Sequence, residues 1–223
     1  MLHKQNEIKL VLWGVAGSLL AVLLFAGRWL AVGNFTFDFV VWNLFLAWLP
    51  LLFAAMAWRW WEKRPFSLLC TTLWLLFFPN APYILTDFIH LRQRGGVPIW
   101  FDFLLLLAFA LAGLYVGLLS LDWLHRLVAR ENGRFWGWFF VFTTLSLSSF
   151  GVYMGRFWRW NSWDMLLQPT AVLSHLSHTL ANPIHAQHTA AVTLLLTIIL
   201  LISYTCFKKR RDWEIEKVSL PAS

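Results

Sequence analysis

Long apolar stretches separated by short polar ones run through the whole sequence. Each of six stretches is close to the roughly 20 residues that a helix needs to cross a bilayer. They predict an all-α integral membrane protein, a bundle of six transmembrane helices at about residues 10–32, 38–58, 66–88, 99–121, 135–156 and 188–207. Because no room remains for a large soluble unit beside them, we expect a single membrane domain over residues 1–223.

The longest connection, about residues 157–187, has a helical pattern of its own. Three leucines recur at helical spacing: Leu173, Leu176 and Leu180. His175 and His178 fall on a different face, and Pro169 suits the first turn of a helix. We therefore expect a short amphipathic outer helix before the last span, lying on the membrane or over the bundle.

One predicted span is interrupted in an unusual way. Residues 77–90 read FFPNAPYILTDFIH, an apolar run with two prolines and an asparagine that closes on Asp87 and His90. Each proline leaves backbone groups that lipid cannot satisfy. Broken backbone at membrane depth is tolerated mainly where it lies against protein or a water-filled cavity. The polar site of the chain is therefore expected here.

Composition and charge fit a membrane protein better than a nucleic-acid-binding one. Of the 223 residues, 59% are hydrophobic and 13% are charged, against about 25% charged residues in soluble domains. The basic residues behind the net charge of +7 lie between the apolar runs. In this position they indicate which connections face the cytoplasm. No nucleic acid is therefore expected as a partner. With the N-terminus inside, most basic residues fall on the inner side. We therefore expect a multi-pass plasma-membrane protein with both termini in the cytoplasm.

Ionisable residues gather at the predicted outer ends of the spans. Asp87 and His90 are three residues apart and share a helix face, and a short hairpin is expected to bring Asp102 near Asp87. Arg156 and Arg159 leave the fifth span at the same level. Because a charge at membrane depth needs a partner, the pattern predicts an ion pair of Asp87 or Asp102 with one of these arginines.

Two further features of the spans concern packing and hydrogen bonding. Asn43 and Asn80 lie at about the same depth, roughly 9 Å from the outer end at 1.5 Å per residue. They are placed to hydrogen-bond each other or a ligand, and the alternative is a structural hydrogen bond between helices. In the fourth span, small residues at positions 108, 112, 113 and 117 indicate close helix packing without chemistry.

Four sequence blocks carry a resemblance to a known family. WNLFLAWLPL, LFFPNAPYILTDFIHL, IWFDFLLL and GVYMGRFWRWNSWD, in this order over about residues 40–165, resemble a family of bacterial multi-pass membrane proteins catalogued as a domain of unknown function. The resemblance implies a polytopic protein of the bacterial inner membrane and carries no established substrate, reaction or cofactor. The polar positions inside the blocks are Asn43, Asn80, Tyr83, Asp87, His90, Asp102, Arg156, Arg159, Asn161 and Asp164.

One interpretation of these residues is an enzyme that acts on a lipid or lipid-linked substrate at the outer leaflet. Its candidate catalytic residues are Asp87, His90 and Asp102, as acid or base. Its candidate substrate-binding residues are Asn43, Asn80, Tyr83, Arg156, Arg159, Asn161 and Asp164. The two arginines suit this role because paired guanidinium groups bind phosphate or carboxylate well.

Three alternatives stay open from the sequence. A divalent metal such as zinc is a further hypothesis, with Asp87, His90, His175 and His178 as candidate ligands, although no HExxH motif is present. The chain is otherwise a non-catalytic binding, transport or accessory subunit of a membrane complex. In the last alternative, the ion pairs and asparagine contacts only fasten the outer ends of the helices. The ligand and the oligomeric state are not specified by the sequence.

Overall fold

The computed structural model describes residues 2–93, 96–160 and 164–219, and over these ranges it is helical without a strand. The elements are α1 (Leu2–Val32), α2 (Asp38–Arg59), α3 (Arg64–Phe77), α4 (Asn80–Tyr83), the 3₁₀ helix η1 (Ile84–His90), α5 (Ile99–Asn132), α6 (Arg134–Tyr153), the π-helix η2 (Met154–Trp158), α7 (Asp164–Leu167), α8 (Pro169–Ala181) and α9 (Pro183–Ser219). Within the described residues, six helical stretches are long and apolar enough to span a membrane: Gln5–Val32, Asp38–Arg59, Arg64–His90, Ile99–Asn132, Arg134–Trp158 and Pro183–Trp213. The predicted six-helix membrane bundle is confirmed.

Several helices extend beyond the predicted apolar cores. α5, expected to end near residue 121, continues to Asn132, and α9, expected to end near residue 207, continues to Ser219. In the added part of α5, Asp122 pairs with Arg211 of α9 and Arg126 pairs with Glu7 of α1. The last helix, α9, begins at Pro183, ahead of the apolar run that starts near residue 188. Asn182 Oδ1 accepts hydrogen bonds from the backbone N–H groups of Ile184 (3.0 Å) and His185 (3.4 Å), which caps α9 ahead of its apolar core.

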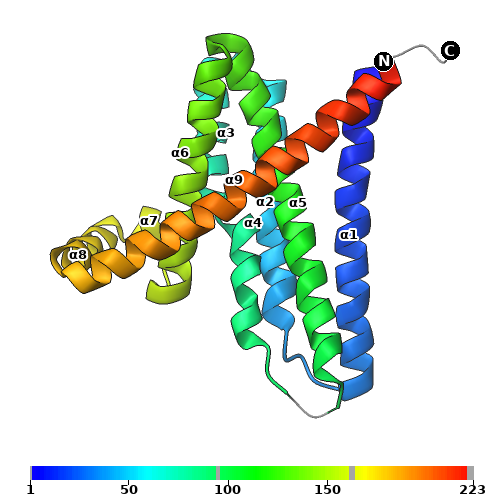
Figure 1. Cartoon of the computed structure of the whole chain (residues 1–223), viewed down its shortest axis with the longest axis vertical. Helices are drawn as coiled ribbons and strands as arrows, with labels where there is room; N and C mark the ends of the chain where they lie inside the picture. The colour runs from blue at the N-terminus through cyan, green and yellow to red at the C-terminus, as the bar shows by residue number, and fades with distance from the viewer. Residues whose placement is uncertain (1, 94–95, 161–163, 220–223) are drawn as a thin grey trace.

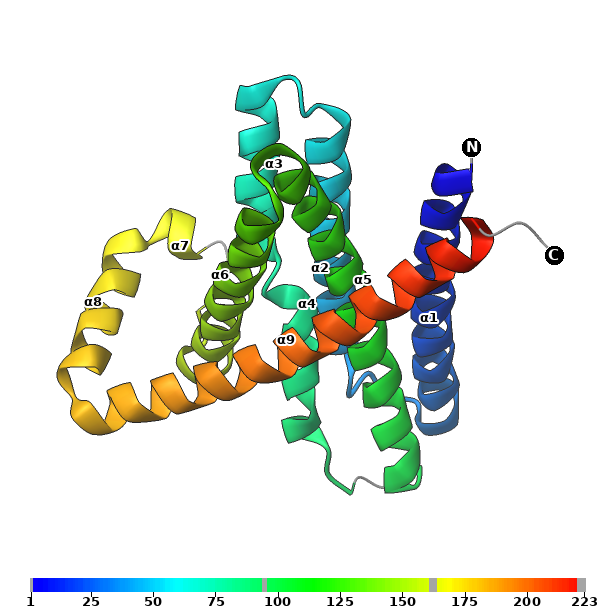
Figure 2. The ribbon, with the colours of Figure 1, turned by 45° about the horizontal axis from the view of Figure 1, so that its top comes forward.

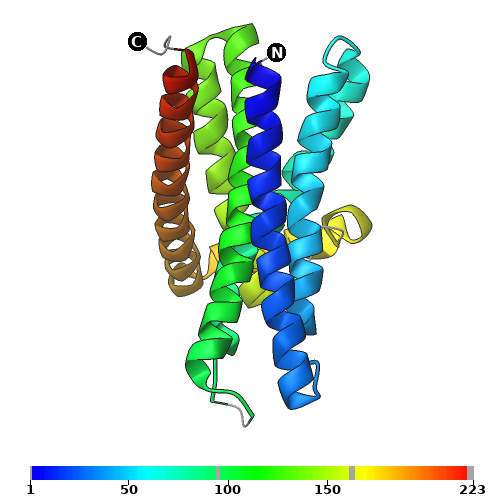
Figure 3. The same cartoon turned by 90° about the vertical axis from the view of Figure 1, so that its right-hand side faces the viewer.

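α5 is the central helix of the bundle. It packs against α1, α2, α6 and the α4–η1 segment. Figures 1 and 3 show α1, α2 and α5 side by side, while α9 crosses the bundle obliquely and packs on α6. The two termini lie at the same end, as six crossings require (Figure 2). The α4–η1 segment and the start of α2 lie toward the opposite end (Figure 1).

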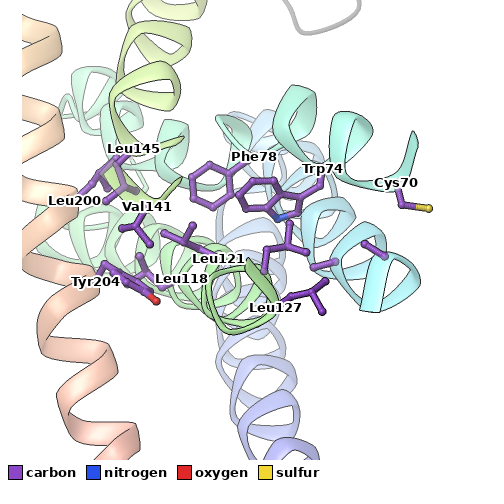
Figure 4. Packing of buried hydrophobic residues seen from close by; sticks show 13 residues of the cluster. Cys70, Trp74, Phe78, Leu118, Leu121, Leu127, Val141, Leu145, Leu200 and Tyr204 are labelled. Carbon is purple, nitrogen blue, oxygen red and sulfur yellow. The ribbon is translucent and has the colours of Figure 1, made fainter. Parts of the chain in front are cut away.

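A buried cluster joins five helices, α2, α3, α5, α6 and α9, in the middle of the bundle. Figure 4 shows Trp74 and Phe78 beside the leucines of α5, with Tyr204 of α9 on the far side of Leu118. The indole Nε1 of Trp74 donates a hydrogen bond of 3.0 Å to Ser120 Oγ, so its one polar atom is satisfied. Since lipid tails are as apolar as these side chains, shape-complementary packing rather than exclusion of water stabilises this cluster.

Small residues of α5 let the broken segment approach closely, as their spacing predicted. A Cβ added at Gly117 would lie 2.5 Å from Ala81 Cβ, and one at Gly113 would lie 2.6 Å from Ile84 Cδ1. The contact at Gly117 cannot be accommodated without movement of the backbone, because Ala81 has no flexible side chain, whereas at Gly113 the end of the Ile84 side chain would have to move. The two glycines therefore set the position of α4 and η1, and with them the position of Asp87.

The predicted outer helix is present as α8, with Pro169 in its first turn. The side that packs on the protein contains Val172 and Thr179, which are buried, and His175, whose ring stacks on Trp158 with centroids 4.6 Å apart. Leu173 is 63% exposed and points away from the protein. The side of α8 that carries His175 therefore faces the bundle, because the His175 ring stacks on a tryptophan there. The spacing of the leucines does not reveal this contact.

Candidate functional site

The third span breaks where its prolines predicted. α3 ends at Phe77, one turn of α4 follows, and the chain then tightens into η1. Asn80 Nδ2 donates a 2.9 Å hydrogen bond to the Phe77 carbonyl, and the Ala81 N–H reaches the Phe78 carbonyl at 3.1 Å. The break leaves backbone carbonyl groups without helical partners, and these groups accept hydrogen bonds from within the protein. Asn80 therefore has a structural role, because its side chain supplies one of the donors.

A second irregular segment faces this break from the end of the fifth span. α6 widens there into the π-helix η2, a geometry that often occurs at functional sites because it re-aims side chains. Gly151 and Gly155 allow the close approach. A Cβ at Gly151 would lie 2.9 Å from Pro79 Cγ, and one at Gly155 would lie 3.0 Å from Tyr83 Cε2. This contact brings Arg156 of η2 against η1.

Asp87 and Arg156 form the ionic centre between the two segments. Arg156 Nη2 donates to Asp87 Oδ1 at 2.5 Å, and Asn43 Nδ2 of α2 donates to Asp87 Oδ2 at 2.9 Å. The Asp87 side chain is 1% exposed and that of Arg156 is 12% exposed. Both carboxylate oxygens therefore have donors, as a buried charge requires.

The remaining contacts of Arg156 fix the plane of its guanidinium. Nε donates to Thr86 Oγ1 at 2.8 Å, and Nη1 donates to His90 Nε2 at 3.2 Å. The guanidinium carbon lies 4.4 Å from the centre of the Tyr83 ring, a cation–π distance. These contacts confirm the predicted pairing of Asp87 with one of the two arginines that end the fifth span, and they add Thr86, which the sequence pattern did not single out.

The ionic centre lines a cavity of about 680 Å³ between α2, the broken third span and the end of α6. Six of the predicted site residues line it: Asn43, Asn80, Tyr83, Asp87, His90 and Arg156. Its apolar lining comes from residues of α2, α3, α6 and η2: Leu46, Leu75, Leu76, Leu147, Phe150 and Met154. Trp42 and Leu147 at its edge are 55% and 50% exposed. One cavity thus combines a charged, hydrogen-bonded end with apolar walls that reach the lipid-facing surface.

The whole region that builds this cavity matches a known family. Residues 42–203, from α2 into α9, match the family described as "Protein of unknown function (DUF1361)". The chain belongs to this family. The match includes both irregular segments and nearly all of the cavity lining. No curated protein and no solved structure matches the chain.

Asp102, one of the candidate catalytic residues, lies outside this cavity and has a different partner from the one expected. Its carboxylate receives hydrogen bonds from Arg28 Nε at 2.7 Å and Nη2 at 3.4 Å, and both side chains are almost fully buried. Arg28 also donates to Asn34 Oδ1 at 3.1 Å and lies 4.8 Å from the Phe37 ring centre. Asp102 therefore pairs with Arg28 and not with Arg156, because α1, which carries Arg28, packs along the start of α5. The candidate catalytic role of Asp102 stays a prediction.

Other candidate residues also lie away from the cavity. Arg159 ends η2 in the left-handed conformation (φ 60°), and its backbone N–H donates to the Met154 carbonyl. Its side chain is exposed and forms no hydrogen bond or ion pair with the described residues. Asp164 begins α7, half-exposed and outside the cavity lining, and Asn161 lies outside the described residues. The π-helical turn explains the difference between the arginines, since it aims Arg156 inward and leaves Arg159 beyond the end of the helix.

The proposed metal ligands are not brought together. Among the described residues, no three His, Cys, Asp or Glu side chains form a group that could hold a metal ion. His175 Nδ1 accepts a 3.2 Å hydrogen bond from Trp160 Nε1, and His178 is exposed. The ligand set of Asp87, His90 and a histidine of α8 therefore does not assemble in this fold.

A second buried ionic network lies toward the end that carries the termini. Asp122 of α5 pairs with Arg126 at 3.0 Å and with Arg211 of α9. Arg126 Nη1 also pairs with Glu7 Oε1 of α1 at 2.7 Å. The i,i+4 spacing of Asp122 and Arg126 is a sequence signal for this pair, but both residues follow the predicted end of the fourth span at residue 121. The network fastens α1, α5 and α9 together and does not line the cavity.

Proposed function

We propose that this chain binds an amphipathic, lipid-like molecule in the 680 Å³ cavity. The observation that carries the proposal is that the Asp87–Arg156 centre and a set of exposed apolar side chains line one continuous space. Its volume lies within the range of about 300–1,000 Å³ of small-molecule sites. A purely structural ion pair needs no cavity beside it.

The polar end of the cavity suits a head group with acceptor oxygens. The guanidinium of Arg156 has more N–H donors than its contacts to Thr86, His90 and Asp87 use. Asp87 compensates its charge, so a ligand with one negative charge or with neutral hydroxyl oxygens fits better than a multiply charged one. The contacts of Arg156 to Thr86 and His90 hold the donors in a fixed plane, which favours bidentate recognition.

The apolar end of the cavity supports entry from the membrane. Trp42 of α2 and Leu147 of α6 are exposed on spans whose outer surface faces lipid. A ligand with a hydrocarbon tail can pass between them without leaving the bilayer. With the termini in the cytoplasm, as the distribution of basic residues predicts, the ionic centre belongs to the outer leaflet.

Two matched arginine variants test the proposal. Arg156→Lys keeps the charge but loses the planar set of donors, whereas Arg159→Lys makes the same change outside the cavity. Protein purified in mild detergent is analysed by native mass spectrometry and by extraction of co-purified lipid. We expect wild type and Arg159→Lys to retain a defined lipid-like molecule and Arg156→Lys to lose it. Equal retention in all three proteins would rule out the Arg156 site.

A second candidate, an enzyme acting on the bound lipid, is favoured by one observation. Asp87 and His90 both line the cavity and both contact the same guanidinium, so an acid and a base lie within reach of one head group. Incubation with total membrane lipids separates the two functions. An enzyme changes the lipid composition in wild type and not in His90→Gln, whereas a binding protein returns every lipid unchanged.

A further inference from the structure

A second hollow lies at the end of the bundle that carries both termini, away from the cavity of the proposed function. It has a volume of about 660 Å³ and is formed by the end of α2, the α2–α3 connection, the first residue of α3 and the last turns of α5. The α2–α3 connection and the last turns of α5 thus meet around one space. The Asp87–Arg156 centre contributes no residue to this hollow.

The hollow is lined by more basic than acidic side chains. Arg59, Lys63, Arg64 and Arg130 line it together with the acidic Glu62 and Glu131. Only one ion pair is formed among them, between Arg64 Nη2 and Glu131 Oε2 at 3.2 Å. The side chains of Arg59 and Lys63 are exposed and form no hydrogen bond or ion pair with the residues that the structure describes. The lining therefore keeps an excess of positive charge that the protein itself does not neutralise.

Tryptophans place this hollow at the level of lipid head groups. Trp58, Trp60 and Trp61 line it, and the Arg64 guanidinium carbon lies 4.4 Å from the Trp61 ring centre. Tryptophan concentrates at the membrane–water interface because its ring is apolar and its N–H is polar. Basic pockets between helices at that level bind the phosphate groups of anionic lipids.

We propose that this hollow is a binding site for the phosphate of an anionic lipid in the leaflet on the side of the termini. The arginines and the lysine contact the phosphate, and the tryptophans contact the glycerol and upper acyl chains. The ligand reaches the site from the bilayer that already surrounds α2 and α3. The site is independent of the amphiphile at Arg156, because the two hollows share no lining residue. The α2–α3 connection lies toward the opposite end of the bundle from η1 (Figure 1).

Delipidated full-length protein in detergent, titrated with phosphatidylglycerol or phosphatidylcholine and followed by native mass spectrometry, tests this inference. The test variant is Arg59→Gln/Lys63→Gln/Arg130→Gln. The matched control is Lys9→Gln/Arg134→Gln/Lys209→Gln, which removes the same charge from exposed residues at the same end that do not line the hollow. We expect the control to keep its preference for phosphatidylglycerol and the test variant to bind it about fivefold more weakly for each cation removed.

Two results would overturn the proposal. If both triple variants lose the preference equally, the protein responds to overall charge and not to a site. If inorganic phosphate binds to wild type while phosphatidylglycerol shows no preference over phosphatidylcholine, the ligand is free phosphate and not a lipid. Thermal unfolding of each variant in the same detergent shows that the exposed substitutions leave the fold intact.

Discussion

Asp87 and Arg156 are 69 residues apart in the sequence, yet Arg156 Nη2 lies 2.5 Å from Asp87 Oδ1. The contact joins a 3₁₀ segment of the third span to a π-helical segment of the fifth, so two departures from regular helix meet at one ion pair. Neither departure is needed to cross a membrane. Their meeting beside a cavity is the reason to treat this pair as part of a site.

Breaking this pair from one side is expected to cost more than removing it entirely. Arg156→Met leaves the buried Asp87 carboxylate without its cation, which should lower the free energy of unfolding by about 3–5 kcal/mol. The double variant Asp87→Leu/Arg156→Met removes both charges and should be more stable than Arg156→Met alone. Unfolding by denaturing detergent, with Arg159→Met as the control expected to match wild type, measures the difference. A double variant no more stable than Arg156→Met would contradict this account.

The pair of Arg28 and Asp102 should behave as a structural contact only. Arg28→Met leaves the nearly fully buried Asp102 carboxylate without its cation. This change should again lower the free energy of unfolding by about 3–5 kcal/mol. Because Asp102 lies outside the cavity, the retained lipid should be unchanged in any Arg28→Met protein that folds. Stability and lipid content are measured on the same preparation. Loss of the lipid with stability unchanged would place Asp102 back in the functional site.

Sequence patterns predict this fold well wherever the property is local. Apolar runs give the six spans, and the prolines of residues 77–90 give the break, because each depends on neighbouring residues alone. The spacing of Asp87 and His90 correctly places both on the cavity. These signals need no knowledge of which helices are neighbours.

The partners of the charged residues could not be predicted in the same way. Arg28 and Asp102 are 74 residues apart, and their pairing depends on α1 packing along α5, which no periodicity reveals. The choice of Arg156 over Arg159 depends on a π-helical turn that changes which side chain points inward. Non-local packing therefore decides the contents of the site, even though the sequence locates it.

The close approach of α5 to the broken segment can be tested with two glycines. Gly117→Ala places a methyl group 2.5 Å from Ala81 Cβ, and the overpacking should cost about 1–3 kcal/mol. Gly27→Ala in α1 meets no atom within 4 Å, so it should be neutral or slightly stabilising because alanine favours helix. Melting temperatures in one detergent compare the two. Equal effects would mean that α5 and α4 are less tightly packed than the structure shows.

The orientation of the protein in the membrane decides which leaflet supplies the ligand. Basic residues concentrate on the side of the termini, so the connection before α5 should face outward and the α5–α6 turn inward. In a Cys206→Ser background, which leaves only the buried Cys70, Gln93→Cys in intact cells should react with an impermeant thiol reagent. Asn132→Cys should react only after the membrane is opened. Both positions are exposed, so a difference in labelling reports the side and not burial. The reverse labelling would place the Asp87–Arg156 centre toward the cytoplasm and its ligand in the inner leaflet.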